Sequence, residues 1–109
     1  MEKINSSFGA CMVSRNIYEG KGRLKWCIRE KSVRDADNGW RFLSEIDTDE
    51  YLADKKNWCV LAYETLIDIE PAILPIYNMP VGTELTLLYE DNKKTFVDRK
   101  TGEPVELLY

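Results

Sequence analysis

Apolar residues recur at every second position in several short stretches of this chain, a pattern typical of strands with one buried face. Residues 24–29 show it most regularly, because Leu24, Trp26 and Ile28 share one face of the predicted strand and Cys27 lies on the other. Residues with strand composition or the same alternation recur along the chain. We therefore predict strands over residues 8–14, 24–29, 40–44, 57–63, 83–89 and 95–97.

One stretch near the middle of the chain organises the predicted core. It begins with the dipeptide Asn38-Gly39, whose residues tolerate positive φ and favour a tight reversal into a strand. Trp40 and Phe42 then fall on one face of that strand, and Arg41 falls on the other. We expect both rings to be buried and the guanidinium to point away from them. A short polar connection favours antiparallel pairing of this strand with the one that carries Trp26.

Helical signals are confined to the middle of the chain. Asp47 with Glu50 three residues later resembles a capping box, which predicts one or two helical turns ending near Asp54. Residues 64–69 predict a second short helix, and Pro71 suits the first position of a third. The order of strands first, short helices next and a hairpin last predicts an α+β fold. We expect a small single domain over residues 1–109, with a mainly antiparallel sheet and two or three short helices.

Charge is spread unevenly along the 109 residues, which carry a net charge of −4. Residues 1–45 contain nine Lys and Arg against six Asp and Glu, whereas residues 46–91 contain two against ten. Such an acidic middle is a candidate surface for a basic partner, and equally an ordinary solvated surface. The chain lacks both a membrane-spanning apolar run and a signal-peptide segment at its N-terminus, so we expect a cytoplasmic protein with no membrane partner.

Residue types exclude several kinds of chemistry. There is no histidine, so catalytic mechanisms and zinc sites that need imidazole are excluded. Cys11, Cys27 and Cys59 are odd in number and widely spaced, which favours buried structural thiols over a disulfide framework. A thiolate near Lys25, or a pair of carboxylates from residues 47–70, remains open as a histidine-free enzyme.

Two ligand hypotheses based on basic residues are weak. Gly20-Lys21-Gly22 could suggest a phosphate cradle, but the longer glycine spacing and the Ser or Thr of a P-loop are missing. We therefore expect residues 15–23 to be a connecting loop. Several basic residues surround Trp26, but the overall acidity and the strand alternation disfavour nucleic acid.

Several segments together resemble a family of small bacterial immunity-protein domains, the family numbered thirty-three, formerly a domain of unknown function. The resemblance covers about residues 9–96 and is carried by Cys11-Met12-Val13-Ser14, Gly20-Lys21-Gly22, Asn38-Gly39-Trp40-Arg41-Phe42, Asp49-Glu50-Tyr51-Leu52, Asp68-Ile69-Glu70-Pro71-Ala72-Ile73-Leu74-Pro75 and Pro80-Val81-Gly82-Thr83. It implies a protein that binds and neutralises a toxin, with no catalytic residues and no cofactor.

The leading hypothesis is thus a non-enzymatic domain that binds a protein partner, and the candidate partner is a cognate toxin. The alternatives are a regulatory or ligand-binding accessory domain and, third, the histidine-free enzyme. The candidate partner-binding residues are Asp47, Asp49, Glu50 and Tyr51, which place an aromatic ring within a dense negative patch.

The lack of histidine and the dispersed cysteines predict that the protein holds no structural zinc. Metal analysis of protein purified without chelator or metal-affinity capture tests this. One zinc per chain would contradict it.

Overall fold

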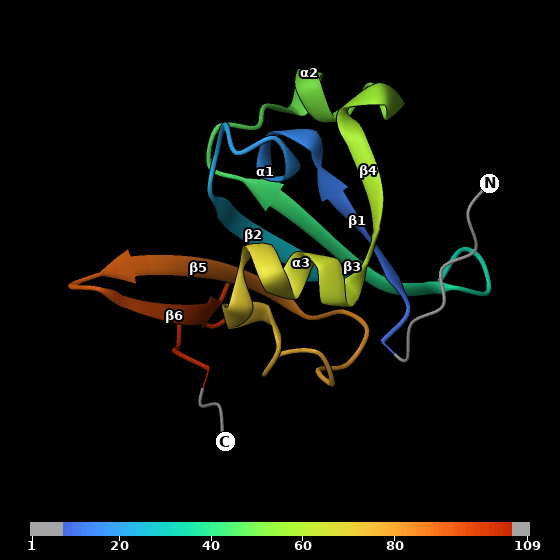
Figure 1. Cartoon of the computed structure of the whole chain (residues 1–109). Coiled ribbons are helices and arrows are strands. Elements are labelled where there is room, and N and C mark those ends of the chain that lie inside the picture. The colour runs from blue at the N-terminus through green and yellow to red at the C-terminus, as the bar shows by residue number, and fades with distance from the viewer. Residues whose placement is uncertain (1–7, 106–109) are drawn as a thin grey trace.

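In the computed structural model, which describes residues 8–105, six strands form a single sheet (Figure 1). The strands are β1 (Ala10–Ser14), β2 (Leu24–Arg29), β3 (Asp37–Ser44), β4 (Trp58–Ala62), β5 (Glu84–Glu90) and β6 (Lys93–Asp98), in the order β4-β1-β3-β2-β5-β6. The pairing of β1 with β3 is parallel, and the other neighbouring pairs are antiparallel. The predicted α+β class with a mainly antiparallel sheet is confirmed. Residues 1–7, whose sequence lacks the apolar segment of a signal peptide, and residues 106–109 lie outside the described residues.

Short helices connect the strands. They are α1 (Arg15–Tyr18), α2 (Asp49–Leu52), α3 (Tyr63–Ile69) and two 3₁₀ turns, η1 (Lys55–Asn57) and η2 (Pro71–Ile73). The predicted helix near residues 64–69 and the helical role of Pro71 are confirmed.

Two local predictions are wrong. Residues 15–23 were expected to be loop throughout, but Ser14 accepts a hydrogen bond from the Asn16 N–H and starts α1 there. The predicted capping box made Asp47 the N-cap of the helix that ends near Asp54, which is α2 in the structure. The cap of α2 is Thr48, whose side chain accepts from the Tyr51 N–H at 3.1 Å.

One face of the sheet carries the core. Trp40, Phe42 and Tyr63 are fully buried, so the predicted burial of the two β3 rings is confirmed. Their rings form a chain of contacts, with centroids 5.8 Å apart for Trp40–Phe42 and 5.9 Å apart for Phe42–Tyr63. The Tyr63 hydroxyl donates to the Ile73 carbonyl at 2.7 Å, which ties α3 to η2 beneath the sheet. Leucine and isoleucine side chains from α3, from η2 and the loop after it, and from β5 complete this core.

The face assignment predicted for β2 is wrong. Cys27 is fully buried in the core, whereas Trp26 and Ile28 are half-buried and lie outside the core cluster. Leu24 is nevertheless buried, because the pairing of β2 with β3 shifts register between Leu24 and Trp26. Such an irregularity exchanges the faces of the residues on either side of it, and strict alternation in the sequence conceals the exchange.

We predict that Trp40→Ala lowers the free energy of unfolding by about 3–5 kcal/mol, because it empties a fully buried aromatic site. Equilibrium denaturation in urea measures this. Trp26→Ala is the matched control and should cost markedly less, because that ring is half-buried. Equal losses for the two variants would contradict the assigned core.

Candidate functional site

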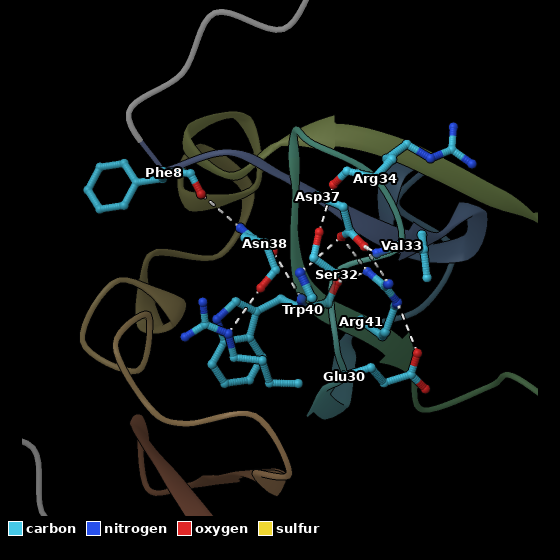
Figure 2. Close-up of polar contacts among 11 residues, drawn as sticks. Phe8, Glu30, Ser32, Val33, Arg34, Asp37, Asn38, Trp40 and Arg41 are labelled. Atoms are coloured by element: carbon cyan, nitrogen blue, oxygen red, sulfur yellow. Dashed lines mark hydrogen bonds and ion pairs between the residues drawn. The ribbon is translucent and has the colours of Figure 1, made fainter.

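A buried ion pair lies within β3 (Figure 2). The Arg41 guanidinium meets the Asp37 carboxylate at two points, Nη1 to Oδ1 and Nη2 to Oδ2, both 2.8 Å. Only 6% of the Arg41 side chain and 7% of the Asp37 side chain are exposed. Glu30 adds a third charge, with its Oε2 3.3 Å from the Arg41 Nε. Arg41 points away from Trp40 and Phe42 as predicted, and it offers its guanidinium to neighbours on its own side of the sheet.

The same carboxylate orders the loop over residues 30–36. Asp37 accepts hydrogen bonds from the Val33 and Gly39 N–H groups, each at 2.9 Å, in addition to those from Arg41. These donors, the guanidinium above all, hold the pKa of Asp37 well below its usual range. Every residue of the loop is exposed, and 67% of Val33 is accessible. The Asp37 carboxylate of the ion pair therefore also holds the exposed loop over residues 30–36 in place (Figure 2).

Asn38 and Gly39 do not form the predicted tight turn, because both lie inside β3. Gly39 has a φ of +88°, and a Cβ at this position would lie 2.1 Å from the Glu30 carbonyl oxygen. Asn38 bonds outward instead, donating to the Phe8 carbonyl at 2.9 Å while its side-chain oxygen accepts from the Trp40 N–H. Only Gly39 of the dipeptide takes a positive φ, and that conformation serves a bulge within the strand, not a reversal before it.

The predicted partner-binding residues divide into two groups. Asp49 and Glu50 are exposed on α2, and Tyr51 is half-buried beside them. Asp47 lies before the helix, and both its carboxylate oxygens are engaged internally. They accept from the Ser14 hydroxyl, the Asn16 side-chain amide, and the Ser44 backbone N–H and hydroxyl, at 2.7–2.8 Å. Asp47 thus fastens the start of the segment to β1, α1 and β3.

The other end of this segment is fastened as well. The Trp58 indole N–H donates to the Leu52 carbonyl at 2.8 Å, and the Asn57 amide donates to the Tyr51 carbonyl at 2.8 Å. The short helix α2 is therefore held at both ends while its two carboxylates project freely into solvent.

A groove of about 490 Å³ was not predicted from the sequence. It lies where the end of α3 approaches the Gly20-Lys21-Gly22 loop and the hairpin of β5 and β6. Its charges are paired: Arg23 binds Glu45 through two contacts of 2.9 and 3.1 Å, and Lys94 lies 2.8 Å from Glu70. These residues come from four separate parts of the chain, and no local sequence pattern links them.

The glycine loop beside the groove is not a phosphate cradle. Its backbone N–H groups are used internally: Gly20 donates to Ile17, and both Lys21 and Gly22 donate to the Asn16 carbonyl. This supports the interpretation of the loop as a connection.

The two buried thiols are poor nucleophiles. Burial raises the pKa of Cys11 to about 12 and also raises the pKa of Cys27. Cys59 is half-buried on β4, and all three thiols are free. Within residues 8–105, no group of three or more Cys, Asp or Glu is arranged to hold a metal ion, and no helix is long and apolar enough to cross a membrane.

The model of the Immunity protein Imm33 domain matches residues 11–98, which run from β1 to the last residue of β6. This chain belongs to the Imm33 family. The match includes the Asp37–Arg41 pair, α2 and the groove, so all three belong to the Imm33 domain itself. No curated protein and no solved structure matches the chain.

Membership of Imm33 supports an immunity-like role and implies a protein partner. The resemblance inferred from ordered short motifs is thereby confirmed over nearly the same residues. The arrangement of this Imm33 domain offers exposed, well-anchored surface elements, namely the loop over residues 30–36 and helix α2.

We predict that Asp37→Asn lowers the free energy of unfolding by about 3 kcal/mol or more at pH 7, because it leaves a buried guanidinium without its main partner. The folded-state pKa of Asp37 is depressed, so its contribution is complete above the unfolded pKa of about 3.9 and is lost as pH falls below it. The difference between wild type and variant should therefore shrink below about pH 4.

Chemical denaturation at a series of pH values measures this difference. Asp35→Asn, an exposed neutralisation in the adjacent loop, is the control and should be nearly silent. A difference for Asp37→Asn that stays constant down to pH 2 would contradict the role of the charge.

Proposed function

We propose that this Imm33 domain neutralises a toxin by binding it directly, in the cytoplasm of the cell that encodes both proteins. Family membership over residues 11–98 is the observation that carries the proposal. The domain acts in this proposal by covering a surface of the toxin, without catalysing a reaction. The high pKa values of the two buried thiols agree with this, because neither supplies a thiolate near neutral pH.

We place helix α2 in the toxin-binding surface. Asp49 and Glu50 expose two carboxylates on one turn, and Tyr51 provides an aromatic ring beside them. Anchoring of the segment by Asp47 and by the Trp58 indole limits the conformational entropy lost on binding. An acidic, pre-positioned turn suits a basic toxin surface, where opposite charges accelerate encounter.

The first test asks whether the domain protects a cell. The polypeptide encoded by the adjacent open reading frame is expressed alone and together with this chain. Cell growth and co-purification of the two polypeptides are measured. We expect the neighbouring polypeptide alone to arrest growth, and the pair to grow and to co-purify as a complex. Growth rescue without a complex would favour a regulatory role. A neighbouring polypeptide that is harmless, or that neither binds nor is neutralised, would contradict the proposal.

The second test concerns the surface. We predict that the double variant Asp49→Asn, Glu50→Gln associates with the toxin roughly three- to tenfold more slowly at low ionic strength, with a smaller difference at high salt. Stopped-flow or surface-based association rates measure this. Asp47 is left intact because its hydrogen bonds hold the segment.

The matched control removes the same charge elsewhere. Glu90→Gln with Asp91→Asn neutralises two exposed acids at the turn between β5 and β6. Asn is well suited to the positive φ of 46° at position 91. If both double variants slow association equally, only net charge matters and α2 is not in the interface. If neither changes the rate, α2 has no electrostatic part in binding.

A further inference from the structure

Strand β4 forms one edge of the sheet (Figure 1). It lacks the features that usually keep an edge strand from pairing with another strand. Its five residues are Trp-Cys-Val-Leu-Ala, without a charge or a proline. Val60, in the middle, is 58% exposed. Edge strands present unpaired backbone groups, and natural proteins usually shield them with charges, prolines, bulges or covering segments. None of these devices occurs within β4.

The opposite edge of the same sheet is shielded. Strand β6 begins with Lys93 and Lys94, and the chain after it folds back along its outer side. The Asp98 N–H donates to the Glu103 carbonyl at 2.9 Å, and the Val105 N–H donates to the Phe96 carbonyl at 2.8 Å. The sheet therefore has one closed edge and one open edge.

The hydrogen bonds of β4 to β1 show which of its backbone groups face outward. The Tyr63 N–H donates to the Gly9 carbonyl at 2.9 Å, so this pair belongs to the bonded positions of the antiparallel ladder. The Ala10 N–H turns away from β4 and donates to the Ala36 carbonyl at 2.7 Å, which agrees with this phase. Opposed residues alternate between bonded and non-bonded pairs along such a ladder.

Counting along the ladder, Cys59 and Leu61 use their backbone groups toward β1. Val60 therefore directs both its N–H and its C=O to the open edge, and the Trp58 C=O and the Ala62 N–H point the same way. The Trp58 N–H is already bonded to the Lys55 carbonyl, and Ala62 is the N-cap of α3, so its carbonyl accepts the first bond of that helix. No backbone hydrogen bond from another described residue occupies the remaining outward groups.

We propose that β4 pairs antiparallel with β4 of a second copy of this chain, about a two-fold axis that passes through Val60. Val60 of one protomer then lies opposite Val60 of its partner, and Trp58 lies opposite the partner's Ala62. The Val60 pair exchanges two N–H···O bonds, and each pair of Trp58 with the partner's Ala62 gains one, from the Ala62 N–H to the Trp58 carbonyl. A two-fold axis at either end of the strand would match fewer of the outward groups.

Charge favours a second copy in this orientation. Lys55 and Lys56 are exposed immediately before β4, and Glu64 follows it on α3. Antiparallel pairing brings the lysine end of one strand to the glutamate end of the other, with no like charges opposed within the strands. The isologous contact also covers the exposed Val60 with its own counterpart.

Sedimentation analysis of the full chain from about 1 µM to about 1 mM tests the proposal, a range chosen because a single pair of strands makes a small interface. We expect the mass to rise from 12.7 kDa toward twice that value. Val60→Lys should weaken the dimer at least about tenfold, because it opposes two like charges at the axis. Val60→Glu should do the same, and an equal mixture of the two variants should restore a mixed dimer.

Val81→Lys is the matched control, because Val81 is 55% exposed, outside β4. It should dimerise like wild type, and all variants should keep the wild-type circular dichroism. Wild type that stays monomeric throughout, Val60→Lys that dimerises normally, or variants that do not combine would each overturn the proposal.

Hydrogen exchange of wild type provides a second, mutation-free readout. Protection of the Val60 and Ala62 amides should rise with protein concentration, while the Cys59 and Leu61 amides should stay protected at every concentration. Concentration-independent exchange of the first set would overturn self-pairing. Protection that appears only when the toxin polypeptide is added would do so too, in favour of a strand donated by the toxin.

Discussion

The Asp37–Arg41 ion pair is the contact on which the centre of this structure depends. Residues four apart in a regular extended strand lie about 13 Å apart, a separation that does not suit a two-point ion pair between them. The charged groups of Asp37 and Arg41 nevertheless meet at 2.8 Å. They do so because the five residues from Asp37 to Arg41 of β3 run beside only the three residues from Ala10 to Met12 of β1. The positive φ of Gly39 permits this excess, and the space left by its missing side chain is taken by the Glu30 carbonyl.

This constraint links the core to the surface. On one side of β3, the side chains of Trp40 and Phe42 are fully buried in the core. On the other side, Arg41 is held by its ion pair with Asp37. The carboxylate also accepts from Val33 and so holds the exposed loop over residues 30–36. A buried charge pair contributes little stability over an apolar replacement, but removal of one partner is costly. Its value here is positional, because the Asp37 carboxylate binds Arg41, the Gly39 N–H at the bulge and the Val33 N–H in the loop together.

The surface elements invoked for binding follow from the same sheet. Helix α2 is fastened through Asp47 to β1 and β3, the two neighbouring strands that pair in parallel. Strand β4 is the edge beside β1, with uncharged side chains and outward backbone groups. The two surfaces use different physics. Exposed carboxylates on α2 act at long range and are screened by salt, whereas the edge of β4 offers short-range, directional hydrogen bonds.

Local patterns in the sequence determined most of the elements and the family. Alternation and strand composition located the strands, and Pro71 indicated the start of a later helix. The ordered motifs indicated the immunity-protein family that the Imm33 match confirms. The burial of Trp40 and Phe42 followed from their spacing alone. These properties depend on neighbours within a few residues, where side-chain periodicity and turn preferences act directly.

Tertiary structure alone decided the rest. The faces of β2 depended on a register shift against β3, and the role of Gly39 depended on the approach of the Glu30 carbonyl from the loop that follows β2. Asp47 changed from a surface acid to an anchor because Ser14, Asn16 and Ser44 converge on it. The strand order that leaves β4 at an edge arises from long-range pairing. Most of the contacts behind these facts join residues distant in sequence, for which composition and spacing carry no signal.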